Sequence, residues 1–367
     1  MPVTVPLDRA LGTVLAVDLR ARGDVPVADA SAMDGYAVHG AGPWSVRGQV
    51  LAGGAPAPAL ADGDAVEVAT GALVPVGTDR VLPVEVVTVT DGVLDLSGPG
   101  PERRHVRPRG EECATGDLLV RAGHVVNAGL LGLAAGTGSD ELLVRRRPRV
   151  AALLTGDELV VAGLPVPGQV RDAVGPLLPG AVGTLGGDLV RLERCGDAPV
   201  DLDLALDRLL GEDCDVVVTC GMAGSGPADR LRPWLARTGA DLVVDGVAVR
   251  PGHPMVLALL PGGRPLVGLP GNPLAAVAAL LGLVGPLLEG LCGREAGVPE
   301  RATLQGWQPR GRPSTSLVPV VRAADRVVVP SGAAGPAQLR GLAAADAVAV
   351  VPDGWDGVAP VELLPIL

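Results

Sequence analysis

The stretch Val150-Ala151-Ala152-Leu153-Leu154 is a continuous apolar run, as expected for a strand that is buried on both faces. Similar short apolar runs follow it, and most are separated by segments with the pattern of helices. The predicted strands are 190–194, 216–219, 242–244 and 265–269, and the predicted helices are 172–186, 201–211, 228–238 and 274–289. Strands that alternate with helices predict a parallel sheet with right-handed crossovers, so residues 148–292 are predicted to form an α/β domain.

Residues 23–117 show the pattern of a β-rich domain. Short runs such as 65–69 and 86–90 alternate apolar with polar side chains, and turns containing Gly, Pro or Asp separate them. The dipeptide Asp91-Gly92 predicts a hairpin turn after the second of these runs.

Residues 1–22 and 118–147 are predicted to form one further domain, which is elongated and links the others. Its first part is predicted as a short strand followed by an amphipathic helix from Leu7 to about Arg22. Its second part is predicted as a helix over 127–135 and a returning strand.

Residues 296–367 return to short strands with Gly and Pro turns, which predicts a small C-terminal β domain. The chain has 367 residues, too many for one ordinary core, so about two to four domains are expected. The predicted fold class is therefore α/β plus β, in an elongated multidomain subunit with a parallel-sheet α/β domain.

The composition excludes some classes of function. Apolar residues make up 48% of the chain and aromatic residues only 1%, so the cores must be built from aliphatic side chains. The net charge is −11 and the chain contains no Lys. A nucleic-acid groove needs a positive face with stacking aromatic rings, so no nucleic-acid partner is expected.

No membrane segment is predicted. The longest apolar run, 274–288, is shorter than a membrane span and contains Pro286, so it is interpreted as a buried helix. The N-terminus has no apolar signal core. The five cysteines are odd in number, widely spaced and without a CxxC pair, which is typical of reduced thiols in a cytoplasmic protein.

Two predicted strands of the α/β domain end in turns that suit an anion. Strand 216–219 runs into a glycine-rich loop, 220–226, whose backbone N–H groups would face a ligand at a helix start; the alternative is an ordinary turn. Strand 265–269 runs into Pro270-Gly271-Asn272-Pro273, where Asn272 fits a helix N-cap and Pro273 the first helical position. A well-capped helix is the alternative there.

A third strand end carries carboxylates. Leu154 is followed by Thr155-Gly156-Asp157-Glu158, and paired carboxylates at such a place can coordinate Mg²⁺ or position water. The alternative is a solvated turn with an N-capping Asp. Ligands of α/β sheets bind at the carboxyl ends of the strands, so these turns are expected to share one edge.

Two basic segments are candidate anion sites. Residues 103–112 hold four Arg within seven positions, and Arg forks suit phosphate and other oxyanions; the alternative is a solvated charged loop. Arg250-Pro251-Gly252-His253-Pro254 is a rigid turn with two basic side chains, and His253 can bind an anion when it is protonated. An ordinary loop is the alternative.

The stretch Ser31-Ala32-Met33-Asp34-Gly35-Tyr36-Ala37-Val38 contains the single Tyr of the chain beside one of its four Met. Because Tyr and Met are so rare in this chain, their occurrence side by side in one string makes the string a candidate functional segment. A core position for Tyr36 is the plain structural alternative.

Taken together and in order, these strings resemble the molybdopterin molybdenumtransferase family, the molybdenum insertases that include gephyrin E-domain-like proteins. The resemblance covers about residues 7–292, and the C-terminal region is similar only in its β character. The strings that carry it are 31–38, 70–79, 107–112, 155–159, 220–229, 250–254 and 269–273.

The resemblance implies a four-part elongated subunit with a molybdopterin-binding α/β domain. It implies a homodimer whose active cleft lies between the α/β domain of one subunit and the second domain of the other. The implied reaction takes adenylylated molybdopterin and molybdate, releases AMP and leaves molybdenum on the pterin dithiolene, with Mg²⁺. The molybdopterin adenylyltransferase is a candidate partner.

The resemblance also assigns roles to residues. Asp34, Glu158 and Asp229 would be catalytic and would handle metal, water or the pterin phosphate, while Thr70 and Arg107 would line the cross-subunit wall. The full set of implied substrate-binding residues is Thr70, Arg107, Thr155, Gly156, Asp157, Asp197, Gly221, Ser225, Gly226, Arg250, His253, Pro270, Gly271, Asn272 and Pro273.

The chain departs from the family strings at several positions. The 220–229 loop is altered, the lysines of the family turn at 250–254 become Arg250 and His253, and an Asn of the family pattern becomes Val174. One alternative therefore stays open, a non-catalytic paralogue that binds the pterin nucleotide or a partner enzyme. A hydrolase acting on another nucleotide is a more distant alternative.

Overall fold

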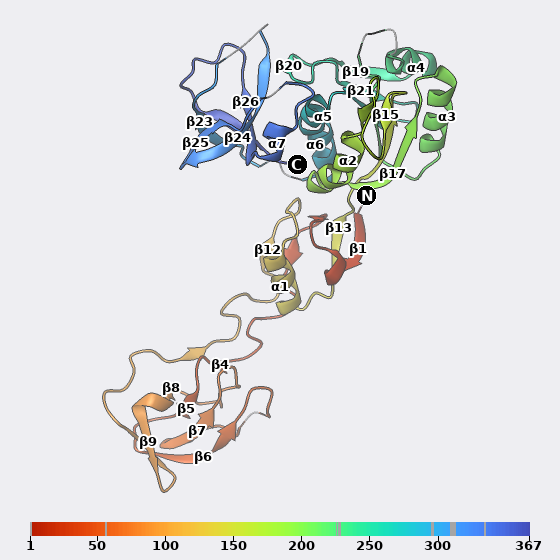
Figure 1. Ribbon diagram of the computed structural model, residues 1–367. Helices are drawn as coiled ribbons and strands as arrows, with labels where there is room; N and C mark the ends of the chain where they lie inside the picture. Colours follow the sequence, from red (N-terminus) through yellow and green to blue (C-terminus); the bar gives the residue numbers. More distant parts are fainter. Residues whose placement is uncertain are drawn as a thin grey trace. The chain divides into compact units, whose positions relative to one another are not determined.

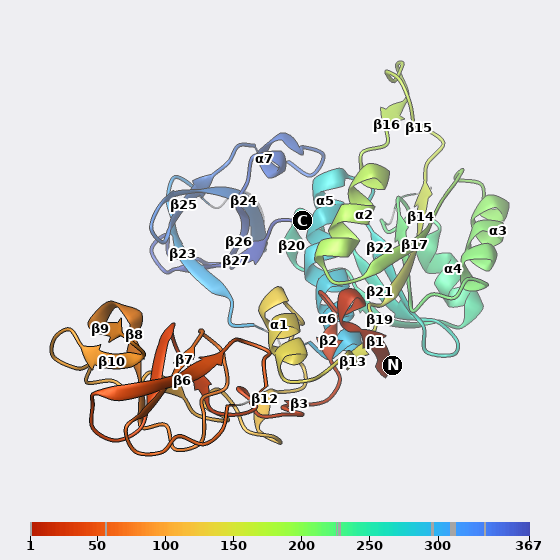
Figure 2. The ribbon, with the colours of Figure 1, turned by 90° about the horizontal axis from the view of Figure 1, so that it is seen from below.

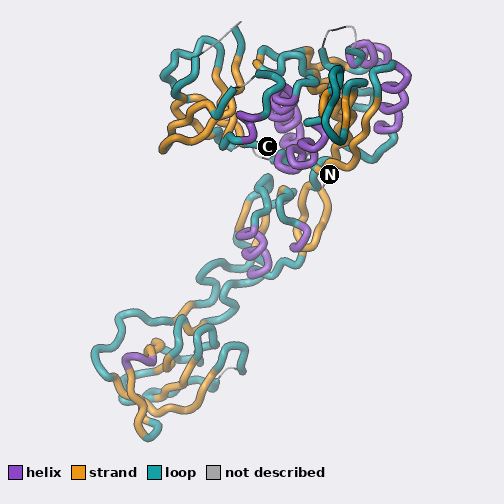
Figure 3. Tube along the Cα trace, in the orientation of Figure 1, coloured by secondary structure: helices purple, strands orange, loops and turns teal. Residues whose placement is uncertain are grey.

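A computed structural model describes the chain in residues 2–55, 57–224, 226, 229–294, 297–308, 313–333 and 335–367. The chain divides into two compact units, one with Gly12–Val14 and Arg145–Leu367 and the other with Pro2–Leu11 and Leu15–Val144. Figure 1 gives the element labels, and Figure 3 shows that strands and loops outweigh helices in the N-terminal unit.

The start of the chain forms a small sheet in the order β1-β13-β2, and β12 pairs with β3 beside it. Helix α1 is capped by the Asn127 side chain, whose Oδ1 accepts a hydrogen bond from Leu130 N at 2.8 Å. The elements are β1 (Pro2–Pro6), β2 (Val14–Leu15), β3 (Leu19–Arg20), β12 (Leu118–Val120), α1 (Ala128–Gly136) and β13 (Glu141–Arg145).

The helix predicted from Leu7 to Arg22 is wrong. Only a 3-10 turn, Leu7–Arg9, forms there. Gly12 then takes a positive φ of +75°, which is outside the helical region. The next backbone groups bond elsewhere: Leu15 N donates to the His124 carbonyl and Ala16 N to the Leu143 carbonyl, so strand pairing replaces the helix.

The rest of the N-terminal unit is built on a six-stranded sheet in the order β8-β5-β7-β6-β10-β9. The predicted hairpin at Asp91-Gly92 is confirmed, with φ values of 48° and 79° that suit a two-residue turn and Thr90 paired with Val93. The elements are β4 (Ala30–Ser31), β5 (Gly35–Val38), β6 (Trp44–Val50), β7 (Asp64–Val68), β8 (Arg80–Pro83), a 3-10 turn (Val84–Val86), β9 (Val87–Thr90), β10 (Val93–Leu96) and β11 (Val106–Arg107).

The second unit contains an α/β sheet in the order β17-β14-β18-β22-β21-β19. Each face of the sheet is covered by helices that share an apolar core with it. Helices α2, α5 and α6 cover one face, and helices α3 and α4 cover the other. The strands are β14 (Arg149–Thr155), β17 (Asp188–Cys195), β18 (Val216–Cys220), β19 (Asp241–Asp245), β21 (Val256–Leu259) and β22 (Pro265–Leu269), and the helices are α2 (Val174–Thr184), α3 (Pro199–Leu210), α4 (Leu231–Thr238), α5 (Pro273–Ala279) and α6 (Gly285–Cys292).

The sheet is mixed, so the prediction that all its strands are parallel is wrong. Strands β17, β14, β18 and β22 pair in parallel, but β21 pairs antiparallel with both β22 and β19, so β21 alone runs against the other strands. Strand β21 was not predicted from the sequence; it is joined to β22 by the tight turn in which Leu260 N donates to the Arg264 carbonyl. So short a connection allows only antiparallel pairing, because a parallel one needs a long crossover.

A two-stranded ribbon, β15 (Leu159–Val160) and β16 (Val170–Arg171), extends from the end of β14 and returns to α2, as Figure 2 shows. Helices α5 and α6 are joined by a π-helical turn, Leu280–Val284. The helix Pro273–Cys292 that they form together has the length and composition of a membrane span, but 61% of its apolar window is buried in the protein. It is therefore a core helix, as predicted for this run.

The C-terminal residues form a second sheet in the order β20-β24-β25-β23-β27-β26, and β24 also pairs with β26, so five strands close on themselves. Strand β20 comes from the α/β region and joins this sheet at its edge. The elements are β20 (Val249–Arg250), β23 (Glu300–Leu304), β24 (Thr315–Ala324), β25 (Val327–Pro330), α7 (Arg340–Ala343), β26 (Ala347–Val351) and β27 (Val361–Pro365).

Candidate active site

The carboxyl ends of four parallel strands bring most of the predicted site residues to one edge of the α/β sheet. Thr155 at the end of β14 pairs with Cys195, and Cys220 pairs with Leu154 and Leu269. The turns that follow the four strands are therefore neighbours. They contain Thr155, Gly156, Asp157, Glu158, Asp197, Gly221, Pro270, Gly271, Asn272 and Pro273.

Close backbone packing joins three of these turns. Gly221 has a φ of +117°, and a Cβ there would lie 2.5 Å from both the carbonyl oxygen and Oγ1 of Thr155. A Cβ on Gly271 would lie 3.4 Å from the Gly221 Cα. At Gly221 only glycine allows this approach, and Gly271 lies next to it, so the turns after β14, β18 and β22 form one contiguous backbone surface.

Side-chain hydrogen bonds hold the same turns together. Thr155 is buried, and its Oγ1 donates to the Cys220 carbonyl at 3.2 Å. Cys220 Sγ donates to the Pro270 carbonyl at 3.3 Å. Burial, with a contribution from the Asp172 charge, raises the pKa of the Cys220 thiol to about 12, so this cysteine is a structural thiol.

The glycine-rich loop after β18 is closed by Asp229. One carboxylate oxygen of Asp229 accepts from Gly224 N at 2.9 Å, and the other accepts from Gly226 N at 2.6 Å. These two N–H groups, predicted to face a phosphate, are thus satisfied within the loop. The predicted residue Ser225 lies outside the described residues.

The carboxylates at the ends of β14 and β17 have different roles. Asp157 and Asp197 are joined by two hydrogen bonds, each from the backbone N–H of one residue to the carboxylate of the other. Asp197 N donates to Asp157 Oδ1 at 3.2 Å, and Asp157 N donates to Asp197 Oδ2 at 3.4 Å. Glu158 is exposed, and its backbone carbonyl accepts from Val170 N at the base of the β15–β16 ribbon. Burial first, and then the charges of Asp201, Asp197 and Asp157, raises the pKa of the Cys195 thiol to about 11.

The turn Pro270–Pro273 begins helix α5 as predicted, with Pro273 at the first helical position. Asn272 occupies the N-cap position, but its side chain makes no capping hydrogen bond, so that part of the prediction is wrong. The Pro336 carbonyl instead accepts from Leu274 N at 2.9 Å and from Ala275 N at 3.2 Å. The C-terminal β region thus caps this helix, which no local sequence pattern signals.

The turn 250–254 is also supported by the C-terminal sheet. Val249 and Arg250 pair with Thr315 and Ser316 of β24. His253 is exposed, and its Nδ1 lies 2.7 Å from the Val247 carbonyl oxygen; because a carbonyl only accepts, Nδ1 is the donor in this hydrogen bond. Its Nε2 is then available to a ligand.

Asp34, Thr70 and Arg107 belong to the other compact unit. Asp34 Oδ1 accepts from Thr70 N at 2.7 Å and from Thr70 Oγ1 at 2.9 Å, and these bonds hold the pKa of the Asp34 carboxyl below its usual value. Arg107 lies in β11, paired with β4, and its Nε donates to Glu111 at 2.8 Å. All three side chains are exposed.

The carboxylates do not gather into a metal site. Within the described part of the chain, no group of three or more His, Cys, Asp or Glu side chains could hold a metal ion. Both oxygens of Asp229 and one of Asp34 are already engaged by N–H or hydroxyl donors. Within the described residues of each unit, the side chains therefore do not by themselves enclose the Mg²⁺ ion that the resemblance implies.

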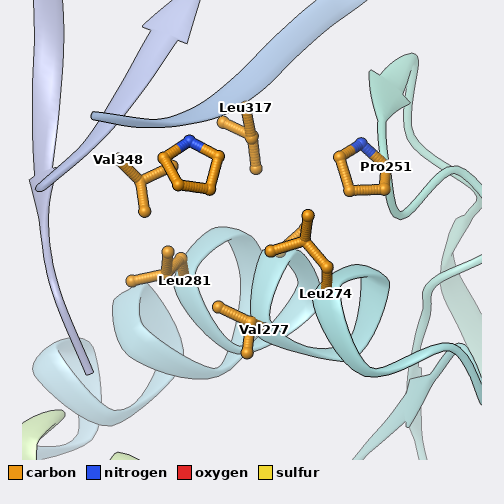
Figure 4. Close-up of a pocket in the computed structure, with 8 residues that line it drawn as sticks. Pro251, Leu274, Val277, Leu281, Leu317 and Val348 are labelled. Carbon is orange, nitrogen blue, oxygen red and sulfur yellow. The ribbon is translucent and has the colours of Figure 1, made fainter. Parts of the chain in front are cut away.

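One pocket lies between α5 and the C-terminal sheet (Figure 4). Its lining is wholly apolar and includes none of the predicted site residues. The residues are Pro251, Leu274, Val277, Ala278, Leu281, Leu317, Pro319 and Val348. An anionic substrate needs polar partners, and this lining offers none. We therefore interpret the pocket as a space left by packing between the helix and the C-terminal sheet.

Comparison with known proteins places the chain in a family. Residues 1–138 match the MoeA N-terminal region (domain I and II), and residues 151–290 match a family described as a probable molybdopterin binding domain. Molybdopterin molybdenumtransferase 2 of Mycobacterium tuberculosis is 35% identical over 306 residues, which are 78% of this chain and 74% of that protein. The chain belongs to the molybdopterin molybdenumtransferase family, a family of enzymes of molybdenum cofactor biosynthesis.

Other relatives extend the likeness to the whole chain. The molybdopterin molybdenumtransferase of Staphylococcus aureus is 28% identical over 371 residues, covering 97% of this chain and 88% of its own length. A solved structure of a molybdopterin biosynthesis MoeA protein from Pyrococcus horikoshii has a TM-score of 0.78 at 28% identity and covers 100% of this chain. The multidomain fold is therefore that of these proteins.

Proposed function

We propose that this protein transfers molybdenum from molybdate to adenylylated molybdopterin and releases AMP. The observation that carries the proposal is the contiguous backbone surface at Thr155, Gly221 and Gly271, in a chain of this family. Open backbone at the carboxyl ends of parallel strands is where α/β proteins bind their ligands. Side-chain and backbone bonds already fix its shape, so little ordering is needed when substrate binds.

We assign the chemistry to the exposed carboxylates. Asp34 and Glu158 are available to position water or a substrate group, and Asp229 sets the shape of the loop that receives the pterin phosphate. Arg250 and His253 would receive molybdate or phosphate. The turn residues at 155–157, 197, 221, 226 and 270–273 would contact the pterin nucleotide, and Thr70 and Arg107 would complete the wall.

The remaining parts of the proposal concern assembly and ions. Asp34, Thr70 and Arg107 belong to one unit and the other site residues to the second unit. We infer a homodimer whose cleft combines the α/β domain of one subunit with the β-rich domain of the other, in the cytoplasm, with the molybdopterin adenylyltransferase as a candidate partner. Mg²⁺ is included as a requirement to be tested, since the described carboxylates do not enclose it.

The test is AMP release from adenylylated molybdopterin with and without molybdate. Asp34→Asn and Glu158→Gln each remove a carboxylate charge and keep the side-chain size. We expect each to lower the rate of molybdate-stimulated AMP release by about 100-fold or more, as for loss of an acid–base or charge-positioning group.

Matched controls are Asp95→Asn in the β-rich region and Glu289→Gln in α6, which lie outside the site and should retain the wild-type rate. Unchanged rates in both Asp34→Asn and Glu158→Gln would contradict the assignment. Tight binding of the substrate by the wild type without AMP release would contradict the proposed reaction.

A further inference from the structure

A buried carboxylate holds an arginine at the edge of the α/β sheet. Arg194 lies one residue before the end of β17, paired with Leu154 of β14. Its Nε and Nη2 donate to Asp172 Oδ2 at 3.0 and 2.7 Å. The other carboxylate oxygen of Asp172 accepts from Gly175 N at 2.8 Å, in the first turn of α2.

The pair is rigid at one end and open at the other. The Asp172 side chain is 3% exposed, whereas that of Arg194 is 38% exposed. A Cβ on Gly175 would lie 2.3 Å from both Arg194 Nη2 and Asp172 Oδ2, so the guanidinium lies directly on the helix backbone. The two bonds to Asp172 use Nε and one hydrogen of Nη2, which leaves Nη1 and the second Nη2 hydrogen for another acceptor.

The charged residues at this edge of the sheet indicate a role for Arg194. The turns 155–158, 196–198, 220–226 and 269–273 carry the carboxylates Asp157, Glu158 and Asp197 and no cationic residue in their sequences. Arg194 lies at the end of β17, and Arg232 also reaches this edge, where its Nη1 donates to the Gly224 carbonyl. An anionic substrate would be repelled by those carboxylates. A fixed guanidinium with a free fork is the side chain that best holds a tetrahedral oxyanion.

We propose that Arg194, oriented by Asp172, binds a tetrahedral oxyanion of the substrate at the carboxyl edge of the α/β sheet. This inference rests on the proposed function, and it adds a substrate contact that the sequence strings did not include. The oxyanion is either a phosphate of adenylylated molybdopterin or molybdate itself. Asp172 acts as a positioning residue, because it touches Arg194 and the helix backbone and does not need to touch substrate.

The test is Arg194→Met, which keeps much of the aliphatic stem and removes the charge. Loss of a charge-assisted contact should raise the KM for the substrate that Arg194 holds by about 10- to 100-fold, with a smaller change in kcat. A raised KM for adenylylated molybdopterin alone identifies a phosphate, and a raised KM for molybdate alone identifies that ion. Direct binding of that same substrate, measured by calorimetry, should weaken in parallel with the rise in its KM, and binding of the other substrate should not change.

The matched control is Arg191→Met. Arg191 lies on the same strand and is also paired with a carboxylate, Glu193, through bonds of 2.8 and 3.0 Å. Side chains of a strand alternate between faces, so Arg191 lies on the opposite face from Arg194. It should leave KM and binding unchanged.

A second variant, Gly175→Ala, keeps every charge but displaces the guanidinium. It should raise the same KM as Arg194→Met, by a smaller factor. If the folded Arg194→Met and Gly175→Ala proteins bind and turn over both substrates like the wild type, the inference is wrong. If the wild type releases no AMP, the proposed function fails, and calorimetric binding lost only in these two variants would still support the oxyanion contact.

Discussion

Asp34 and Thr70 form the best-defined contact among the predicted site residues. They lie 36 positions apart, and both the backbone N–H and the hydroxyl of Thr70 donate to one oxygen of Asp34. These bonds favour the ionised carboxylate. Its lowered pKa means that the bonds stabilise the fold above the pKa of the unfolded chain and that this stability is lost as the pH falls through the folded value.

Thr70→Val tests this contact. This change keeps the hydrogen bond from the backbone N–H of residue 70, which lowers the Asp34 pKa most, and removes the bond from the hydroxyl. The Asp34 pKa should therefore rise part of the way to its usual value. A carboxyl titration by NMR measures it, and the acid-side loss of stability should begin at a higher pH. Thr88→Val, which removes a hydroxyl paired with Ser97 instead, should leave the Asp34 titration where it is. An unshifted Asp34 pKa in Thr70→Val would show that the hydroxyl bond does not matter.

Several residue roles could not be predicted because they depend on distant partners. Asn272 has the local features of a cap, yet the Pro336 carbonyl, 64 residues further along the chain, accepts hydrogen bonds from the first N–H groups of α5. Arg194 looks like a surface residue in an alternating strand, and only the buried Asp172 shows otherwise. Asn127, by contrast, caps α1 as its local sequence suggests.

At the scale of elements, the turn after β18 approaches the end of β14 so closely that it has no room for a side chain at Gly221. Gly221→Ala should lower the free energy of unfolding by about 1–3 kcal/mol, because the methyl group would meet Thr155 and the φ is unfavourable. Urea unfolding measures this. Gly180→Ala is the control, since Gly180 lies in α2 with open space around it and should gain about 0.5–1 kcal/mol. Equal stability of the two variants would contradict the packing described at Gly221.

The sequence predicted elements well where the pattern was local. The hairpin at Asp91-Gly92 and the strand over 150–154 follow directly from turn chemistry and a buried apolar run. The predicted helix over 7–22 failed because its apolar spacing fits a helix while Gly12 and the pairing partners of Leu15 and Ala16 decide otherwise. The antiparallel β21 was missed because a short strand beside a tight turn resembles a loop.

At the scale of the whole molecule, the site residues fall into two sets. Asp34, Thr70 and Arg107 are in one compact unit, and the turns at the edge of the α/β sheet are in the other. We propose that a complete site takes one set from each subunit of a dimer. The two sets could be predicted from the sequence strings because each string is local, but the strings say nothing of which chain supplies which set.

The most direct test of this account mixes two inactive proteins. Asp34→Asn and Glu158→Gln subunits are purified separately, combined under conditions that exchange subunits, and assayed for molybdate-dependent AMP release. If the site is shared, each mixed dimer has one intact site, and random exchange should restore roughly a quarter of the wild-type activity. A mixture that exchanges subunits, as shown by differently tagged chains, yet stays as inactive as either variant alone would contradict the shared site.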